Sequence, residues 1–219
     1  MKLPFDPDEA TAALAAADKR LAKVIERAGP FTVRPLHMQS PFQALLRSIV
    51  YQQLSGKVAK VIHERVVAAI EQHGRLTAEA LVATPTAALR AAGLSRAKAL
   101  AVQDLAAKTL DGTVPSLARM RKMSDAEIVE HLVQVRGIGR WTVEMLLIFR
   151  LGRPDVLPSG DLGVRKGFML TYKTPALPSP RDLEARGERW RPFRSVASWY
   201  LWRAVDLVKA SAEGAALWP

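Results

Sequence analysis

The chain of 219 residues contains no cysteine, which narrows the chemistry it can carry. Without thiols it can form neither a disulfide nor a thiolate zinc site, and no iron–sulfur cluster can be held by cysteine ligands. The four histidines, His37, His63, His73 and His131, have no metal-ligand spacing to one another or to a carboxylate pair. We therefore expect no required cofactor and no iron–sulfur cluster.

Long apolar runs are also missing. No segment reaches the ~20 apolar residues of a transmembrane helix, and residues 1–7 hold no apolar stretch of signal-peptide length. We expect a protein with no membrane partner that is located inside the cell, in the cytoplasm or nucleoid of a bacterium or the nucleus of a eukaryote.

Positive charge is in excess, with 32 Lys and Arg against 21 Asp and Glu and a formal net charge of +11. This balance favours a polyanionic partner, because neutralising phosphates releases condensed counterions. Charge alone leaves an ordinary basic protein open. The hydrophobic content of 49% is enough to bury a full core, as one domain or as two lobes around a cleft.

Apolar residues recur at intervals of three and four along most of the chain, as in amphipathic helices. Representative sets are Leu14, Leu21 and Ile25; Leu45, Ile49 and Val50; and Val58, Val61, Ile62, Val66 and Ile70. Strand-like alternation is nearly absent. A polar stretch with three prolines over residues 175–180 predicts a surface loop, followed by a last helix near residues 190–209. The expected fold class is all-α.

One segment predicts two helices joined by a tight turn. Ser124 and Glu127 have the spacing of a capping box, and apolar residues then follow on one helical face until just before Gly137. Gly137 and Gly139 allow the backbone to turn sharply and to approach a ligand closely. A second helix begins near Arg140, and free N–H groups at such a helix start can bind phosphate.

This segment and three others resemble the helix-hairpin-helix (HhH-GPD) DNA glycosylases, most closely the 3-methyladenine DNA glycosylase II branch. The resemblance extends from about residue 41 to residue 203. Its four blocks, in family order, are IVYQQLSG (49–56), LVQVRGIGRW (132–141), DVLPSGDLGV (155–164) and WRPFRSVASWYLW (190–202). Larger bacterial relatives add an amino-terminal β-rich domain. This chain is short and helical at its start, so we expect it to lack that domain.

The resemblance implies a single glycosylase unit over residues 1–219, built as two helical lobes with a DNA-binding cleft. A middle lobe would run from about residue 41 to 132, and the helix-hairpin-helix from about 124 to 151. Residues 1–40 and 152–219 would form the second lobe, in which the first helix packs with the carboxy-terminal helices. The implied partner is damaged double-stranded DNA, bound by a monomer.

The resemblance also implies that Asp161 is catalytic. Cleavage of an N-glycosidic bond builds positive charge on the sugar, and a fixed carboxylate beneath C1′ can stabilise that charge. Position alone favours a different role, because Asp after Gly160 and before an apolar helix makes a good N-cap. Both roles can hold at once.

The base pocket is expected to include Trp141, Met145 and Trp202. Trp141 stands where strand-cutting relatives carry a lysine nucleophile, so we expect a monofunctional enzyme without AP-lyase activity. Its ring could instead attract a cationic methylated base. Trp202 matches a second pocket aromatic of the family, although its spacing from Trp199 is also typical of core packing. Met145 replaces an aromatic of some relatives, and Gly163 stands where a larger apolar residue can occur.

Gln53 and Leu54 interrupt an apolar helix pattern just before Ser55. In the family, a residue here fills the space left by a nucleotide that is extruded from the duplex so that the enzyme can reach it. Leu54 is the predicted wedge, and Gln53 would face the opposite strand. The alternative is that Leu54 is an ordinary core leucine.

Backbone contacts to DNA are expected from the hairpin and the start of the helix that follows it. The residues concerned are Gly137, Gly139, Arg140 and Thr142. Arg165 and Lys166 could reach flanking phosphates or lie on a solvated helix face. The family hairpin often holds a monovalent cation on backbone carbonyls. Here these would be the carbonyls of Val133, Val135 and Gly137.

The implied function is that of a monofunctional DNA-3-methyladenine-type glycosylase, which flips alkylated purines out of duplex DNA and leaves an abasic site in base excision repair. One alternative is the same scaffold acting on uracil, hypoxanthine or an oxidised purine. The other is a non-catalytic helix-hairpin-helix protein that only binds DNA. A pure binder would have no chemical need for Asp161, Trp141 and Trp202 together.

Overall fold

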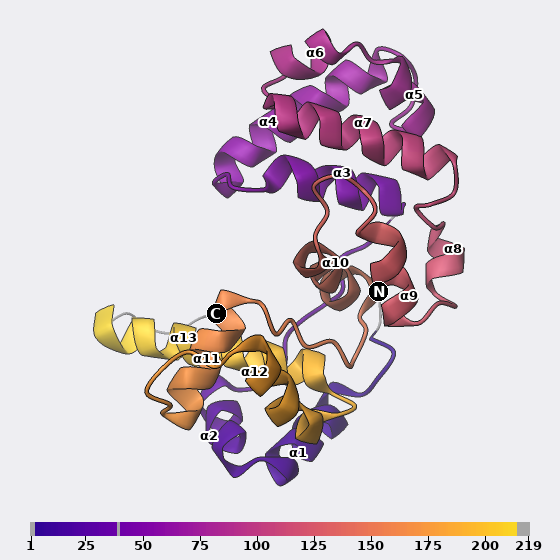
Figure 1. Cartoon of the computed structure of the whole chain (residues 1–219). Helices are drawn as coiled ribbons and strands as arrows, with labels where there is room; N and C mark the ends of the chain where they lie inside the picture. The colour runs from indigo at the N-terminus through magenta and orange to yellow at the C-terminus, as the bar shows by residue number, and fades with distance from the viewer. Residues whose placement is uncertain (1–2, 39, 214–219) are drawn as a thin grey trace. The chain divides into compact units, whose positions relative to one another are not determined.

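The computed structural model describes residues 3–38 and 40–213, which form helices and connecting segments without any β-strand (Figure 1). The prediction of an all-α fold is therefore confirmed. The chain divides into two compact units. We call Met1–Leu36 with Leu147–Pro219 the terminal unit, and His37–Leu146 the middle unit. Among the described helices, none has the length and apolar character needed to cross a membrane.

The middle unit is a set of short helices, most of which begin at a capping Ser or Thr. Its helices are α3 (Pro41–Tyr51), α4 (Gly56–Glu71), α5 (Ala78–Ala83), α6 (Thr86–Ala91), α7 (Arg96–Leu110), α8 (Leu117–Met120), α9 (Asp125–Leu132) and α10 (Arg140–Leu146). Side-chain oxygens accept hydrogen bonds from first-turn N–H groups at Ser40, Ser55, Thr77, Ser95, Ser116 and Ser124. These caps satisfy donors that have no partner within the helix.

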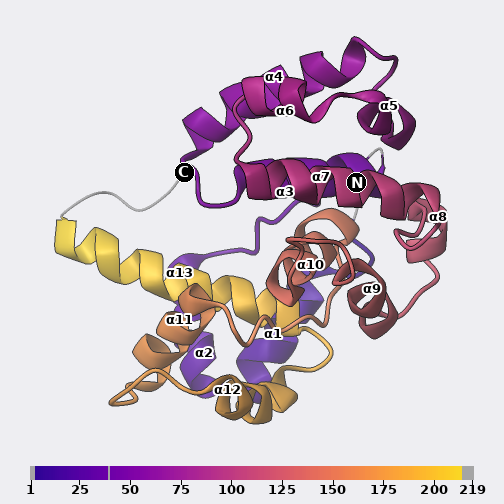
Figure 2. The same ribbon diagram turned by 45° about the horizontal axis from the view of Figure 1, so that its top comes forward.

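The predicted apolar faces of α3 and α4 supply much of the core of the middle unit. Leu45 and Ile49 of α3 are fully buried, as are Val66 and Ile70 of α4. Helix α7 lies beside α3 and contributes Leu105 (Figure 2). Not every apolar residue of the α4 repeat belongs to this core: Val58 and Val61, in the first two turns of the helix, are exposed.

The terminal unit joins the start and the end of the chain. It contains α1 (Pro7–Ala17), α2 (Lys19–Ala28), the π-helical turn η1 (Leu147–Leu151), α11 (Leu162–Tyr172), α12 (Pro180–Gly187), the 3-10 turn η2 (Glu188–Trp190) and α13 (Arg194–Glu213). Helices α1 and α2 pack against α13. Their shared core includes Leu14, Leu21, Phe168, Trp190 and Tyr200.

The sequence pattern predicted a loop from the proline-rich stretch to the last helix. The structure instead has a further helix, α12, between them. Pro180 is the first residue of α12, and Ser179 and Asp182 form a capping box around it. Proline is tolerated at this position because the N–H that it lacks would have no partner within the helix.

The last helix also begins later than predicted, at Arg194. Trp190 lies in η2, and Arg191 is extended, with φ −63° and ψ 143°. A residue before proline is pushed away from the helical conformation by the proline ring, and Pro192 follows directly.

A buried carboxylate connects three elements of the terminal unit. Asp18 caps α2 through the amides of Arg20 and Leu21, and its Oδ2 accepts hydrogen bonds from Tyr172 Oη at 2.5 Å and Trp190 Nε1 at 3.2 Å. Burial raises the pKa of Asp18, but these four hydrogen bonds outweigh that effect and hold the pKa below its usual value. Burial and the bond to Asp18 raise the pKa of Tyr172.

We expect Asp18→Asn to lower the free energy of unfolding at pH 7 by about 1.5–3 kcal/mol, the range for hydrogen bonds to a charged group. The pKa of Asp18 is lower in the folded chain than in the unfolded chain. Its stabilisation is therefore present above the unfolded pKa of about 4 and is lost as the pH falls through the folded pKa.

Urea unfolding of wild type and Asp18→Asn at several pH values measures this effect. The difference between the two proteins should shrink as the pH falls below about 4. Asp8→Asn, at an exposed aspartate of α1, is the control for loss of a carboxylate. A difference for Asp18→Asn that stays constant with pH would contradict the assignment.

Candidate nucleic-acid interface and active site

The predicted hairpin is present in the middle unit. Helix α9 starts at the capping box of Ser124 and Glu127 and ends at Leu132, and α10 starts at Arg140. The connecting residues 133–139 are called the hairpin turn. Gly137 has φ +79°, and a Cβ there would lie 3.3 Å from the Cβ of Ala101 in α7. Glycine is thus needed at position 137 for two reasons: the backbone is in the left-handed region, and α7 packs closely against it.

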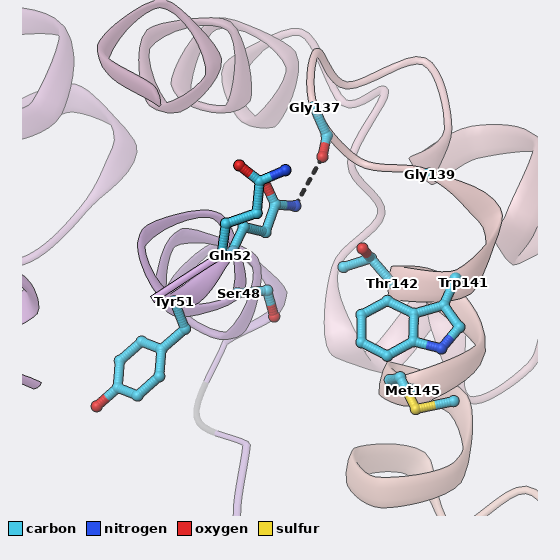
Figure 3. A pocket seen from close by; sticks show the side chains of 9 residues that line it. Ser48, Tyr51, Gln52, Gly137, Gly139, Trp141, Thr142 and Met145 are labelled. Atoms are coloured by element: carbon cyan, nitrogen blue, oxygen red, sulfur yellow. Dashed lines mark hydrogen bonds between the residues drawn. The ribbon is translucent and has the colours of Figure 1, made fainter. Parts of the chain in front are cut away.

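A pocket of about 570 Å³ lies where the end of α3 faces the hairpin turn and α10 (Figure 3). Its lining residues are Ser48, Tyr51, Gln52, Gln53, Gly137, Gly139, Trp141, Thr142 and Met145. The structure therefore brings together six residues singled out from the sequence. Trp141 is 51% exposed and projects from the same helix as Met145. The contribution of Ser48, Tyr51 and Gln52 was not anticipated: Tyr51 and Gln52 were marked only by their place in a family block, and Ser48 lies just before that block.

Residues 52–55 connect α3 to α4 and are called the wedge turn. Gln53 adopts φ 57°, which is unusual for a residue other than glycine. Leu54 is 37% exposed and is not part of the core, so the core alternative for this leucine is wrong. Gln52 Nε2 donates a hydrogen bond of 2.8 Å to the carbonyl of Gly137, which links the wedge turn to the hairpin turn (Figure 3).

The carbonyls expected to hold a cation are partly engaged within the protein. The Val135 carbonyl accepts a hydrogen bond from the Ile138 amide at 3.0 Å, and the Gly137 carbonyl accepts the Gln52 amide. Each carbonyl oxygen has two lone pairs, so these bonds are compatible with a cation as a further partner. Across the part of the chain that the structure describes, no group of three or more His, Asp or Glu is arranged to hold a metal ion.

Asp161 lies in the terminal unit and caps α11, as its sequence position predicted. Its Oδ1 accepts a hydrogen bond of 2.7 Å from the Val164 amide and one of 2.8 Å from Trp202 Nε1. The Trp202 ring is half-buried on α13 and stacks on Phe149, with ring centroids 5.8 Å apart. Trp199, one turn earlier, belongs to the buried core. The two tryptophans thus differ in environment despite their helical spacing.

Gly163 is needed for the contact between Asp161 and Trp202. A Cβ at position 163 would lie 2.8 Å from Trp202 Cδ1, 2.9 Å from its Nε1 and 3.0 Å from Asp161 Oδ1. Real Cβ contacts are essentially never shorter than 3.0 Å, so the indole would have to shift. The absence of a side chain at position 163 therefore fixes how closely the indole approaches the carboxylate.

The three cationic side chains that are candidates for phosphate contacts, Arg140, Arg165 and Lys166, differ in their hydrogen bonds and exposure. Arg140 is exposed, and its Nε donates to Glu144 Oε1 at 2.9 Å. Arg165 donates from Nε to the carbonyl of Pro178 at 2.8 Å and is part-buried, whereas Lys166 is exposed. Arg165 therefore supports the loop before α12, and Lys166 is the more accessible cation of the pair.

The predicted site residues fall into two groups. Trp141, Met145 and the hairpin and wedge turns belong to the middle unit. Asp161, Gly163 and Trp202 belong to the terminal unit, where they contact one another.

Comparison with known proteins identifies a family match over most of this chain. Residues 46–192 match the sequence profile described as HhH-GPD superfamily base excision DNA repair protein. The chain is 36% identical over 190 residues to DNA-3-methyladenine glycosylase 1 of Schizosaccharomyces pombe, covering 86% of this chain and 82% of that protein.

Two solved structures are similar along most of their length. The 3-methyladenine DNA glycosylase of Schizosaccharomyces pombe in complex with abasic DNA has a TM-score of 0.77 and 32% identity, over 89% of this chain and 95% of that one. A DNA-3-methyladenine glycosidase from Bacillus halodurans has a TM-score of 0.82 and 33% identity, over 91% of each chain. The resemblance found in the sequence blocks is thus confirmed.

We expect Gly163→Ala to displace the Trp202 indole from Asp161, at a cost of about 1–3 kcal/mol for overpacking. The indole N–H resonance of Trp202, identified by its loss in Trp202→Phe, should shift in the ¹H–¹⁵N spectrum of the variant. Gly160→Ala is the matched control, because no described residue other than its chain neighbours lies within 4 Å of its Cβ position. An unchanged Trp202 resonance in Gly163→Ala would show that a methyl group fits at position 163 without moving the indole.

Proposed function

The chain belongs to the HhH-GPD superfamily of base excision DNA repair proteins, and we propose that it is a DNA glycosylase that hydrolyses the N-glycosidic bond of alkylated purines in duplex DNA. Similarity to 3-methyladenine DNA glycosylases, at 36% identity to one of them, supports this substrate class. The observation that carries the proposal is the Asp161 carboxylate, held by two N–H donors at the start of α11.

Asp161 supplies the electrostatic part of the reaction. As the base leaves, positive charge develops on the sugar, and a carboxylate near C1′ stabilises this charge and can orient the attacking water. The Val164 amide and the Trp202 indole fix Oδ1 from two directions. The carboxylate is therefore oriented before the substrate binds, and little reorganisation is required as charge develops.

Trp141 supplies recognition of the base. Its indole offers no nucleophile for a Schiff base, so the product is an abasic site and an intact strand. Methylation at adenine N3 or guanine N7 gives the base a positive charge, which an exposed aromatic face attracts. The same charge weakens the glycosidic bond, so no strong general acid is needed.

The middle unit holds the duplex and opens it. The hairpin turn offers backbone groups to phosphates. At Gly139 no described residue other than its chain neighbours lies within 4 Å of the Cβ position, so the backbone is approachable there. Leu54 is the apolar wedge that occupies the stack after the nucleotide is extruded, and its exposure makes it available for this role.

Several further expectations belong to the same proposal. The protein acts as a monomer inside the cell, without a membrane partner and without a required cofactor. A monovalent cation on the carbonyls of Val133, Val135 and Gly137 would stiffen the hairpin turn and add positive charge beside the phosphates.

We expect the purified protein, without divalent metal, to release free methylated base from methylated duplex DNA, and strand breaks to appear only after alkali. Nicking before alkali would contradict monofunctional chemistry. If no methylated base were released, the alkylpurine assignment would be wrong, and duplexes with uracil, hypoxanthine or ethenoadenine would separate another lesion class from a binding-only protein.

Asp161→Asn should lower the rate of base release by roughly 10²–10³-fold or more, as for loss of other preorganised electrostatic groups. Asparagine caps helices as well as aspartate does, so folding and binding to duplex DNA with an abasic-site analogue should be retained. Base release and gel-shift assays on the same preparation measure both properties. Wild-type turnover by Asp161→Asn would show that the carboxylate has been assigned wrongly.

Leu54→Ala should weaken binding to duplex DNA with an abasic-site analogue roughly tenfold, because the wedge no longer offsets the lost stacking. Binding to the same single-stranded oligonucleotide should change little, since it has no stack to fill. Leu100→Ala is the matched control, as Leu100 lies in the same unit and is also 37% exposed. Equal losses on duplex and single strand would rule out the wedge role.

A further inference from the structure

One face of α7 (Arg96–Leu110) contacts both turns that are proposed to bind DNA. The residues concerned are Lys98, Ala101, Asp104 and Lys108, and we call them the α7 frame. Successive members are three, three and four residues apart, which places them along one side of the helix. Helix α7 lies beside α3, from which the wedge turn leaves (Figure 2).

Lys98 holds the start of the wedge turn. Its Nζ donates hydrogen bonds of 2.7 Å to the carbonyl of Val50 and of 2.7 Å to the carbonyl of Gln52. The last carbonyls of a helix have no partner within it, and a cation at this end is also favoured by the helix dipole. The Leu54 amide donates to the carbonyl of Tyr51, and Lys98 caps the carbonyls on either side of it at the end of α3.

The wedge turn needs such support. Gln53 has φ 57°, a conformation that is strained for a residue other than glycine and persists only where neighbouring contacts impose it. Lys98 binds the carbonyl just before Gln53, and the side chain of Gln52 binds Gly137. Burial lowers the pKa of Lys98, in agreement with an ammonium group partly removed from water.

The other end of the frame holds the hairpin turn. Asp104 Oδ2 accepts hydrogen bonds from the Arg136 amide at 2.6 Å and from Lys108 Nζ at 3.0 Å. Lys108 Nζ also donates to the carbonyl of Gln134. Between these residues, Ala101 packs so closely under Gly137 that a Cβ there would lie 3.3 Å away.

We propose that the α7 frame fixes the separation between the wedge turn and the hairpin turn, with Lys98 as the positioning residue for Leu54. The inference rests on the proposed function, in which Leu54 enters the duplex while the hairpin turn holds its phosphates. The Gln52 to Gly137 hydrogen bond joins the two turns directly. Both are therefore ordered before DNA binds, which lowers the entropic cost of binding.

Lys98→Met tests the proposal, because methionine keeps the apolar stem and removes the donors. Amide hydrogen exchange in residues 52–56 should become faster. Affinity for duplex DNA with an abasic-site analogue should fall about tenfold, as expected for the loss of charge-assisted bonds. Affinity for single-stranded DNA should change little. Lys122→Met, at an exposed lysine of the same unit, controls for the loss of one positive charge.

A double-mutant cycle with Leu54→Ala separates positioning from general destabilisation. If Lys98 acts through the wedge, Lys98→Met should weaken duplex binding little further once Leu54 has been truncated. Losses that add fully, or unchanged exchange in residues 52–56, would overturn the proposal. If Lys98→Met does not fold, Gln52→Met, which removes only the bond to Gly137, should give the same pattern with a smaller loss.

These readouts do not depend on catalysis. Failure of the wild-type protein to release a methylated base would contradict the proposed glycosylase function, whereas the exchange and binding measurements would still decide whether the frame positions the wedge turn.

Discussion

Every short helix leaves N–H groups at one end and carbonyl groups at the other without partners, and a protein built from many short helices must satisfy all of these groups. Most helices here begin at a Ser, Thr or Asp whose side chain accepts from the first turn. The same requirement shapes the functional regions. Asp161 caps α11 with the carboxylate assigned to catalysis, and Lys98 caps α3 just before the proposed wedge.

Because Asp161 and Lys98 also cap helices, their side chains are held in fixed positions. A helix cap fixes the rotamer of its side chain, because the hydrogen bond to the backbone has a narrow geometry. At Asp161 the cap is joined by the Trp202 indole, so the carboxylate has two fixed donors rather than one. A local requirement of helix formation thus also orients the carboxylate that is proposed to be catalytic.

Much of the fold could be predicted from the sequence because its signals are local. The capping box of Ser124 and Glu127 and the glycine at position 137 marked the helices and the turn of the hairpin within a few residues. The boundaries that were missed depend on competing local effects. Pro180 could end a loop or begin a helix, and the capping box around it decided for the helix.

The rest of the site depends on side chains that meet only after folding. Lys98 binds a carbonyl 48 positions earlier in the chain, and no periodic pattern reports such a contact. Trp199 and Trp202 share a helix but differ in burial, because the outcome depends on which side of α13 faces the core. Leu54 could be read as core or wedge until its exposure was known.

The lack of space at Gly163 also constrains how this protein could evolve. A larger side chain there would reshape the region beside Asp161, but it would collide with the indole that orients the carboxylate. Positions 163 and 202 are thus linked by epistasis, since a change at the first is tolerated only after a smaller or relocated side chain at the second. A mutational path that enlarges position 163 would therefore have to begin on α13, at a residue forty-one positions away from the carboxylate in the chain.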